Sequence, residues 1–386
     1  MLKLINNSTN MIPHKINLVI FSLLIGAGCG DVKDEKQEPE PQVPDQEEIV
    51  SFTAGDATRA FDAFNKYFYD TDAKLYHSTT KRDQLAQGWT QAVFWDIVMD
   101  AYLRTESPEY LEMIREVYEG GNNAYSDFNW NDVKTVNDFI YDDMMWWVIA
   151  LARGYGITAD QEYLDKAIDG FDFVWEEAFD TINGGMRWSW KVEGKVAAIN
   201  YPTVIAAMYL YNITGKDTYL AKAKNIYSWA QKTLFQEMTG RVADHIVDGH
   251  PPGFEDYTYN QGVCIGAAVM LYRITGSKSY LNDARLAADY TYSTMSDSDG
   301  ILPAEGDWNE QGVLKAIFAR YVYMLIEEGE EQYETWLRKN ASLAWSNRDT
   351  TRNLMFRDYK VKCPEGDFQS YEASSAVGIM QVCPPE

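Results

Sequence analysis

Residues 211–220 read YNITGKDTYL, and the spacing within this stretch occurs four times in the chain. In every copy a Tyr precedes a Thr by three positions, and a Tyr-Leu pair follows that Thr after five positions. The four sets are Tyr102, Thr105, Tyr110-Leu111; Tyr155, Thr158, Tyr163-Leu164; Tyr211, Thr214, Tyr219-Leu220; and Tyr272, Thr275, Tyr280-Leu281. Gly215 and Gly276 follow two of the Thr residues, as C-terminal helix caps do. Each copy therefore predicts a corner between two helices.

The distances between these corners predict the architecture. The four Thr residues lie 53, 56 and 61 positions apart, which is enough for two helices of about 15 residues and two connections. Residues 51–386 hold about six such units. We therefore predict an all-α fold in which six helical hairpins close into an (α/α)6 toroid, with inner helices apolar almost all round and outer helices amphipathic. An open solenoid is the alternative, but it needs polar capping repeats, and no such repeat is evident in the sequence.

One stretch shows the alternation of a strand. Between residues 184 and 198 apolar residues alternate with polar or small ones, and Glu193-Gly194 offers a turn. This pattern predicts a small β-hairpin that projects from the face of the toroid. Trp188 and Trp190 would share one side of it, where they either stack on a flat ligand or pack down on the helices.

The N-terminal residues predict a targeting signal and a tether. The apolar run 16–25 is about half as long as a membrane-spanning helix, so residues 1–28 are expected to be a signal peptide. The end of this run resembles a bacterial lipobox, in which Cys29 is lipidated and becomes the mature N-terminus; an ordinary secretory signal is the alternative. Residues 29–50 are acidic and rich in proline, as in a disordered tether. We expect an outer membrane lipoprotein, facing the cell surface or the periplasm, with the folded domain at 51–386.

Composition limits the classes of partner. With 46% hydrophobic residues the 386-residue chain can bury a large core. Its net charge of −24 would repel nucleic acids and anionic membrane surfaces, so we expect membrane contact only through the lipid anchor. Aromatic residues make up 14% of the chain, which suits a groove that stacks on flat, neutral ligands. Four Cys and four His argue against a disulfide scaffold and a His-built metal centre.

Two adjacent acids begin the most apolar segment. Residues 137–151 read NDFIYDDMMWWVIAL, and the apolar spacing after Asp142 and Asp143 predicts an inner helix. Acidic residues in a first helical turn often complement the helix dipole and cap free N–H groups, which is the structural interpretation. We favour a chemical role, because buried carboxylates are costly and these lie inside a ring among Trp and Tyr residues.

The spacing of the pair suits the cleavage of a glycosidic bond. Neighbouring helical residues keep their Cβ atoms about 5 to 6 Å apart. Retaining glycosidases need two carboxyls about 5 to 5.5 Å apart, one to attack carbon and one to protonate the leaving oxygen. One carboxylate also raises the pKa of its neighbour, which keeps the acid protonated at neutral pH.

At these residues the sequence resembles glycoside hydrolase family 76, the endo-α-1,6-mannanases. The hallmark of that family is an Asp pair followed by Trp-Trp on an inner helix of an (α/α)6 barrel, which residues 137–147 match. The likeness covers roughly residues 80–376 and includes the helix corners, Tyr259-Asn260-Gln261-Gly262 and residues 314–320. The family usually has Phe and Gly where this chain has Leu314 and Ala316, and both changes concern local packing.

The resemblance implies an endo-acting, retaining hydrolase of the α-1,6-mannan backbone of yeast-type mannan. Asp142 would be the nucleophile and Asp143 the acid/base, with no metal or cofactor, and we expect a monomer. The expected substrate contacts are Trp188, Asn200, Tyr259, Asn260 and Asp307, although each of them is as readily a structural residue. Two alternatives stay open. A transglycosylase of the same family would pass the intermediate to a sugar, and a non-catalytic surface glycan-binding lipoprotein would have no use for the acid pair.

Two further groups of residues could bind or bridge. Asp244-His245 and Asp248-Gly249-His250 suggest a metal loop, but Pro251-Pro252 follow at once and favour a surface or substrate-contacting loop. Cys363 and Cys383 could form a disulfide in an oxidising compartment, whereas Cys264 is expected to pack in a helix.

Overall fold

The computed structural model describes residues 50–385 apart from 248 and 307–308. These residues belong to the unit Glu48–Glu386. The predicted signal peptide, with the lipidation site Cys29 and all of the predicted tether except Val50, lies outside the described residues.

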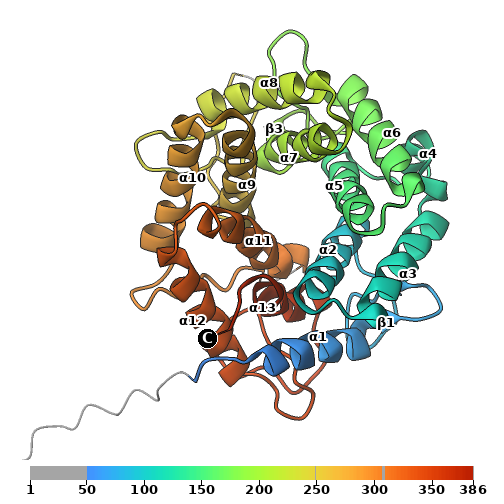
Figure 1. Cartoon of the computed structure of the whole chain (residues 1–386), viewed down its shortest axis with the longest axis vertical. Helices are drawn as coiled ribbons and strands as arrows, with labels where there is room; N and C mark the ends of the chain where they lie inside the picture. Colours follow the sequence, from blue (N-terminus) through green and yellow to red (C-terminus); the bar gives the residue numbers. More distant parts are fainter. Residues whose placement is uncertain (1–49, 248, 307–308, 386) are drawn as a thin grey trace, which may run out of the picture. The chain divides into compact units, whose positions relative to one another are not determined.

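Twelve helices of the described chain form two concentric rings (Figure 1). The inner ring consists of α2 (Gly88–Thr105), α5 (Tyr141–Thr158), α7 (Ala197–Thr214), α9 (Thr258–Thr275), α11 (Leu314–Ile326) and α13 (Ser370–Val382). The outer ring consists of α1 (Ala54–Phe68), α3 (Pro108–Ala124), α6 (Gln161–Ala178), α8 (Asp217–Leu234), α10 (Lys278–Tyr290) and α12 (Gln332–Ser346). Each inner helix packs on the next, and α13 packs on α2. The ring is therefore closed, which confirms the (α/α)6 toroid over the open solenoid.

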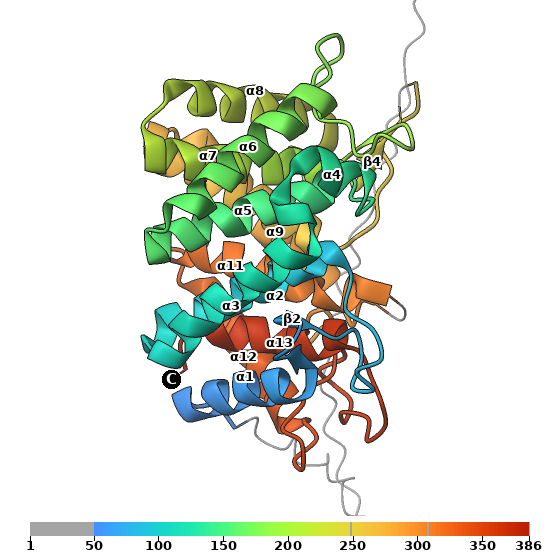
Figure 2. The same ribbon diagram turned by 90° about the vertical axis from the view of Figure 1, so that its right-hand side faces the viewer.

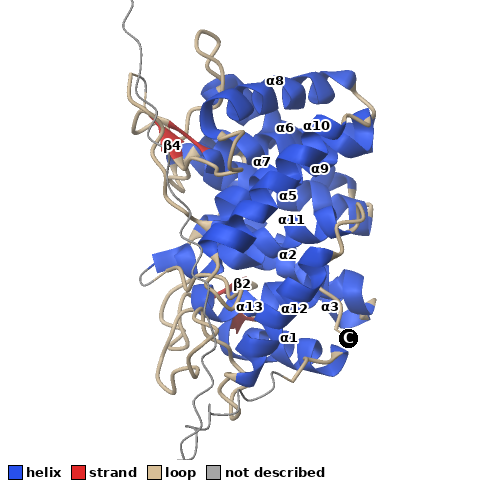
Figure 3. Cartoon of the chain, turned by 90° about the vertical axis from the view of Figure 1, so that its left-hand side faces the viewer, coloured by secondary structure: helices blue, strands red, loops and turns tan. Residues whose placement is uncertain are grey.

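The remaining elements are short. They are α4 (Trp130–Thr135), the helical turns η1 (Ser126–Phe128), η2 (Thr291–Met295) and η3 (Asn309–Val313), and the strands β1 (Tyr69–Asp70), β2 (Leu75–Tyr76), β3 (Lys195–Val196) and β4 (His245–Ile246). β1 pairs with β2 and β3 pairs with β4, both antiparallel. Side views show that most long loops and the strands gather at one end of the ring (Figures 2 and 3).

The repeated Tyr and Thr residues build the corners as predicted. At the end of α7 the Thr214 hydroxyl donates to the Leu210 carbonyl at 2.6 Å, while the Lys216 N–H donates back to the Thr214 hydroxyl at 3.3 Å. Gly215 takes the left-handed conformation, with φ of 67°, and its N–H donates to the Tyr211 carbonyl. The same bonds occur at the ends of α2, α5 and α9. Satisfying the last carbonyls in this way lets the chain reverse without losing backbone hydrogen bonds.

Burial follows the predicted division between the two rings. In α7 every residue from Ala197 to Met208 is buried, so this inner helix has no solvated face. In the outer helix α6 the buried residues recur at the helical period. They are Tyr163, Leu164, Ala167, Gly170, Phe171, Val174 and Ala178. An apolar stripe of this kind covers the inner ring while the opposite face stays in water.

The predicted β-hairpin within residues 184–198 is wrong. β3 pairs with β4 from a distant loop, and within the expected hairpin one backbone bond, from the Trp188 N–H to the Gly194 carbonyl, spans the turn. The Asn200 side chain explains the difference. Its Oδ1 accepts from the Met186 N–H at 2.8 Å and its Nδ2 donates to the Met186 carbonyl at 3.2 Å. These bonds satisfy the backbone groups that a hairpin partner would have used.

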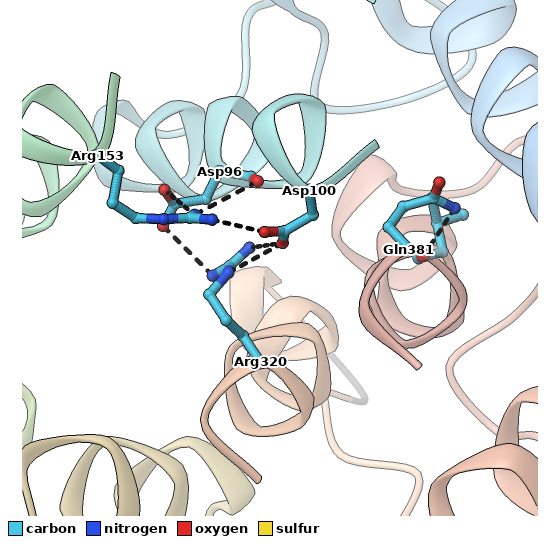
Figure 4. Close-up of polar contacts among 6 residues, drawn as sticks. Asp96, Asp100, Arg153, Arg320 and Gln381 are labelled. Atoms are coloured by element: carbon cyan, nitrogen blue, oxygen red, sulfur yellow. Dashed lines mark hydrogen bonds and ion pairs between the residues drawn. The ribbon is translucent and has the colours of Figure 1, made fainter. Parts of the chain in front are cut away.

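Four charged side chains join three inner helices inside the ring (Figure 4). Asp96 and Asp100 project from α2, Arg153 from α5 and Arg320 from α11. Arg153 bonds Asp96 and Asp100 at 2.5 and 2.6 Å. Arg320 bonds Asp100 at 2.6 and 2.9 Å, and Asp96 at 3.3 Å. Burial raises the pKa of Asp100, but the two guanidinium charges outweigh it and hold that pKa below its usual value.

The remaining sequence expectations concern the cysteines and the membrane-spanning potential of the helices. Cys264, Cys363 and Cys383 are buried free thiols, so the possible bridge between Cys363 and Cys383 is not formed. Cys264 packs within α9 as expected. In the described part of the chain, every helix is too short or too polar to cross a bilayer.

The buried charge cluster gives a stability prediction. Arg320→Met should lower the free energy of unfolding by about 3–5 kcal/mol, because Asp100 keeps a buried charge that Arg153 alone must balance. The matched control is Arg115→Met, since Arg115 forms an exposed pair within α3 and its loss should change stability little. Urea unfolding followed by circular dichroism measures both. An equal effect of the two substitutions would contradict a special role for the cluster.

Candidate active site

A cavity of about 820 Å³ opens at the end of the ring that carries the long loops. Its walls come from the starts of α2, α5, α7 and α9 and from η3, which precedes α11. Its aromatic lining residues are Trp89, Phe139, Trp146, Trp188, Tyr257 and Tyr259, and its acidic ones are Asp138, Asp142, Asp143, Glu193, Asp244 and Glu310. Such a surface suits a neutral ligand with flat faces and many hydroxyl donors.

The Asp pair lies in the first turn of α5, where its surroundings differ between the two residues. Asp142 Oδ2 accepts a hydrogen bond from Trp188 Nε1 at 2.8 Å, and Asp142 Oδ1 accepts from the Asp143 N–H at 3.0 Å. Asp143 Oδ2 accepts from the Ile140 N–H at 3.1 Å. Asp143 therefore caps the helix, as the structural interpretation expects. Both carboxyls are nevertheless half-buried and line the cavity.

The electrostatics of the site favour one shared proton. Burial, together with the charge of Asp143, raises the pKa of Asp142 well above its usual range. Burial raises the pKa of Asp143 to about 7, and Glu310 adds to this rise. Each carboxyl thus resists ionisation while its neighbour is charged, and the two titrate as a pair. The N–H groups of Trp188 and Asp143 that donate to Asp142 oppose the rise in its pKa, and the Ile140 N–H opposes the rise in the pKa of Asp143.

The structure brings two of the five predicted substrate contacts to the cavity. Trp188 and Tyr259 line it. Asn200 and Asn260 are buried behind the wall, and Asp307 lies outside the described residues.

Asn200 and Asn260 position the wall rather than the ligand. Both side-chain groups of Asn200 bond to backbone, so the prediction of a sugar contact there is wrong. Asn260 is one layer behind the surface and donates to Asp244 Oδ1 at 2.9 Å. It therefore acts through Asp244, and the direct contact predicted for it is not available in this geometry.

The sequence reasoning missed Trp89 and Glu310, both of which line the cavity. Glu310 lies close to the start of a buried helix, as Asp142 does, and that position is the signal that could have identified it. Asp244 and His245 also line the cavity, as the substrate-contacting interpretation of their loop expects. His245 Nδ1 lies 3.0 Å from Asp244 Oδ2, so with Asn260 both Asp244 oxygens have partners.

A sequence model described as Glycosyl hydrolase family 76 matches residues 53–383. This chain belongs to glycosyl hydrolase family 76. It is 24% identical over 293 residues to the mannan endo-1,6-alpha-mannosidase DCW1 of Candida glabrata, and the match covers 66% of this chain and 62% of the relative. The chain thus matches less than two thirds of the length of that curated relative.

Solved structures of a bacterial family member are also similar. The α-1,6-mannanase of Salegentibacter sp. HEL1_6 shares 26% sequence identity with a TM-score of 0.78, over 85% of this chain and 98% of that one. With the same coverage and TM-score, this chain matches an inactive variant of that mannanase in complex with α-1,6-mannotetrose. In that variant two consecutive aspartates are replaced by alanine.

The Trp188 contact gives a prediction about the site itself. Trp188→Phe keeps a ring at the wall but removes the N–H that Asp142 accepts, so the pKa of Asp142 should rise further. Titration of ¹³C-labelled aspartate carboxyls by NMR measures this shift. Trp190→Phe is the matched control, because the Trp190 indole donates to the Phe139 carbonyl and not to a carboxylate. A fall in the Asp142 pKa, or an equal change in the control, would contradict the prediction.

Proposed function

We propose that this family 76 chain is an endo-acting, retaining hydrolase of the α-1,6-mannan backbone. One observation carries the proposal: Asp142-Asp143 is the sole Asp-Asp pair in the sequence, and both carboxyls line the large acidic cavity. The similar Salegentibacter enzyme is named an α-1,6-mannanase, and its variant lacking two consecutive aspartates is described as inactive. The curated relative from Candida glabrata is a mannan endo-1,6-alpha-mannosidase.

The proposed reaction has two displacements. In the first, the Asp142 carboxylate attacks the anomeric carbon of a mannosyl unit, the bond from that carbon to O6 of the next unit breaks, and Asp143 gives its proton to the departing O6. In the second, water attacks the same carbon, the Asp142 ester breaks, and Asp143 takes the proton of that water. The Trp188 N–H holds Asp142 Oδ2 and the Asp143 N–H holds Asp142 Oδ1, and each oxygen keeps a second lone pair that can face the anomeric carbon.

The test is a digestion of debranched α-1,6-mannan by the purified domain. We expect a ladder of oligosaccharides, because an open cavity admits the middle of a chain. We also expect the first products to keep the α configuration in ¹H NMR, because two inversions restore it. Asp142→Asn and Asp143→Asn should each lower turnover by orders of magnitude, while Asp169→Asn on the exposed face of α6 should leave it unchanged.

Other outcomes of the digestion would overturn parts of the proposal. Mannose alone would indicate an exo-enzyme, and products longer than the substrate would indicate a transglycosylase. Tight binding without products would identify a glycan-binding protein. β-Configured first products would contradict the retaining route, and near-normal turnover in either Asn variant would remove that residue from the mechanism.

We further propose that the chain is a monomeric outer membrane lipoprotein anchored through Cys29. Support comes from the small residues before Cys29 and the acidic, proline-rich segment after it. Expressed in a bacterial host, the wild-type protein should fractionate with membranes and carry a diacylglycerol mass on its N-terminal Cys. Cys29→Ser should release it into the soluble fraction. An unlipidated mature protein in the soluble fraction would contradict the anchor.

A further inference from the structure

Glu310 occupies a position in the cavity that the reaction described above does not use. It lies in η3, directly ahead of the buried helix α11, and lines the same cavity as Asp142 and Asp143. Its Oε2 atom is inaccessible to solvent and has no hydrogen-bond partner among the described residues. It therefore differs from Asp142 and Asp143, which accept N–H groups of Trp188, Asp143 and Ile140.

A buried carboxylate oxygen without a donor has lost its hydrogen bonds to water and gained none from the protein, which is energetically costly. Burial raises the pKa of Glu310, while hydrogen bonds from its own backbone N–H and from Trp89 oppose that rise. The carboxyl group therefore has some donors, but its Oε2 atom lacks one. Because Glu310 lines the cavity, a rotation of its side chain would present this oxygen to a ligand, and sugar hydroxyls are donors of the required kind.

The charge of Glu310 also acts on its neighbours. The ionisable groups whose charges act on Asp143, or that adjoin it, are Asp138, Asp142, Lys191, Glu310 and Tyr125. Lys191 forms an ion pair with Asp138 at 2.5 Å, so the Asp138 carboxylate largely offsets the effect of the Lys191 charge on Asp143. Among the carboxylates outside the pair, Glu310 contributes most to raising the pKa of Asp143.

We propose that Glu310 is a substrate-binding residue, whose carboxylate turns toward the cavity and accepts a hydrogen bond from a hydroxyl of the mannosyl unit held beside Asp143. This inference rests on the proposed function, because it takes an α-1,6-linked mannoside as the ligand. Binding would then both satisfy the carboxylate and orient the sugar against the acid. Trp89, which packs on the Trp146 ring, would hold the carboxyl through its hydrogen bond.

The test measures binding without turnover. In the double variant Asp142→Asn, Asp143→Asn, isothermal titration with α-1,6-mannotriose gives the parent affinity. Adding Glu310→Leu should weaken binding about tenfold or more, because the hydroxyl loses its acceptor. Glu310→Gln should weaken it less, since the amide oxygen still accepts. Glu237→Leu, on an exposed turn, is the matched control, and thermal melting verifies that each variant is folded.

The outcomes separate this inference from the proposed function. If the double variant binds no α-1,6-mannotriose, the proposed function itself fails. If it binds, and Glu310→Leu binds within twofold of it, the role of Glu310 fails alone. In the active enzyme, Glu310→Gln should also move the alkaline limb of kcat/KM to lower pH, because Asp143 then loses its proton more easily. If the alkaline limb of kcat/KM does not shift, the result would likewise contradict a charged Glu310 beside Asp143.

Discussion

The charge cluster of Asp96, Asp100, Arg153 and Arg320 is the interaction on which the ring depends. It joins α2 to α5 and, across 220 residues of sequence, to α11. Three of these residues line a second cavity of about 440 Å³ formed by the ends of the inner helices, and none of the four lines the large cavity at their starts. Acidic and basic side chains therefore balance each other at the end of the ring that carries the cluster. At the other end carboxylates gather around the large cavity, and such an excess of negative charge is typical of a functional site.

The sequence predicted the parts of the fold that local chemistry determines. The Tyr and Thr spacing located four of the six hairpin corners, because each corner is closed by bonds within a few residues, as at Thr214. The turn between α11 and α12 has no such Thr, and the last pair, α1 with α13, joins opposite ends of the chain. The failed hairpin has the same explanation. Asn200 on α7 bonds the backbone of Met186, and this contact depends on how α7 packs against that loop.

The sequence likewise predicted those parts of the candidate site that local residue patterns determine. Asp142 and Asp143 could be identified because two acids before an apolar helix are a local anomaly. The closed ring determines which other helix starts face this pair. Sequence reasoning therefore missed Glu310, and it predicted a direct substrate contact for Asn260, which lies one layer behind the cavity surface. Trp188 was predicted as a substrate contact on a β-hairpin. Its bond to Asp142 depends on the actual path of that loop, which the alternation pattern did not predict.

The site also shows how one helical turn can hold two acids in different surroundings. Successive helical residues diverge by about 100°, so their carboxyls meet different neighbours. The carboxylate of Asp142 receives an indole and a backbone N–H, whereas that of Asp143 faces Ile140 and the charge of Glu310. The partial positive charge at the start of α5 acts on both, so it cannot distinguish them. Local N–H groups account for part of the difference, and Trp188 and Glu310, which account for the rest, lie on loops of other hairpins that the closed ring brings to α5.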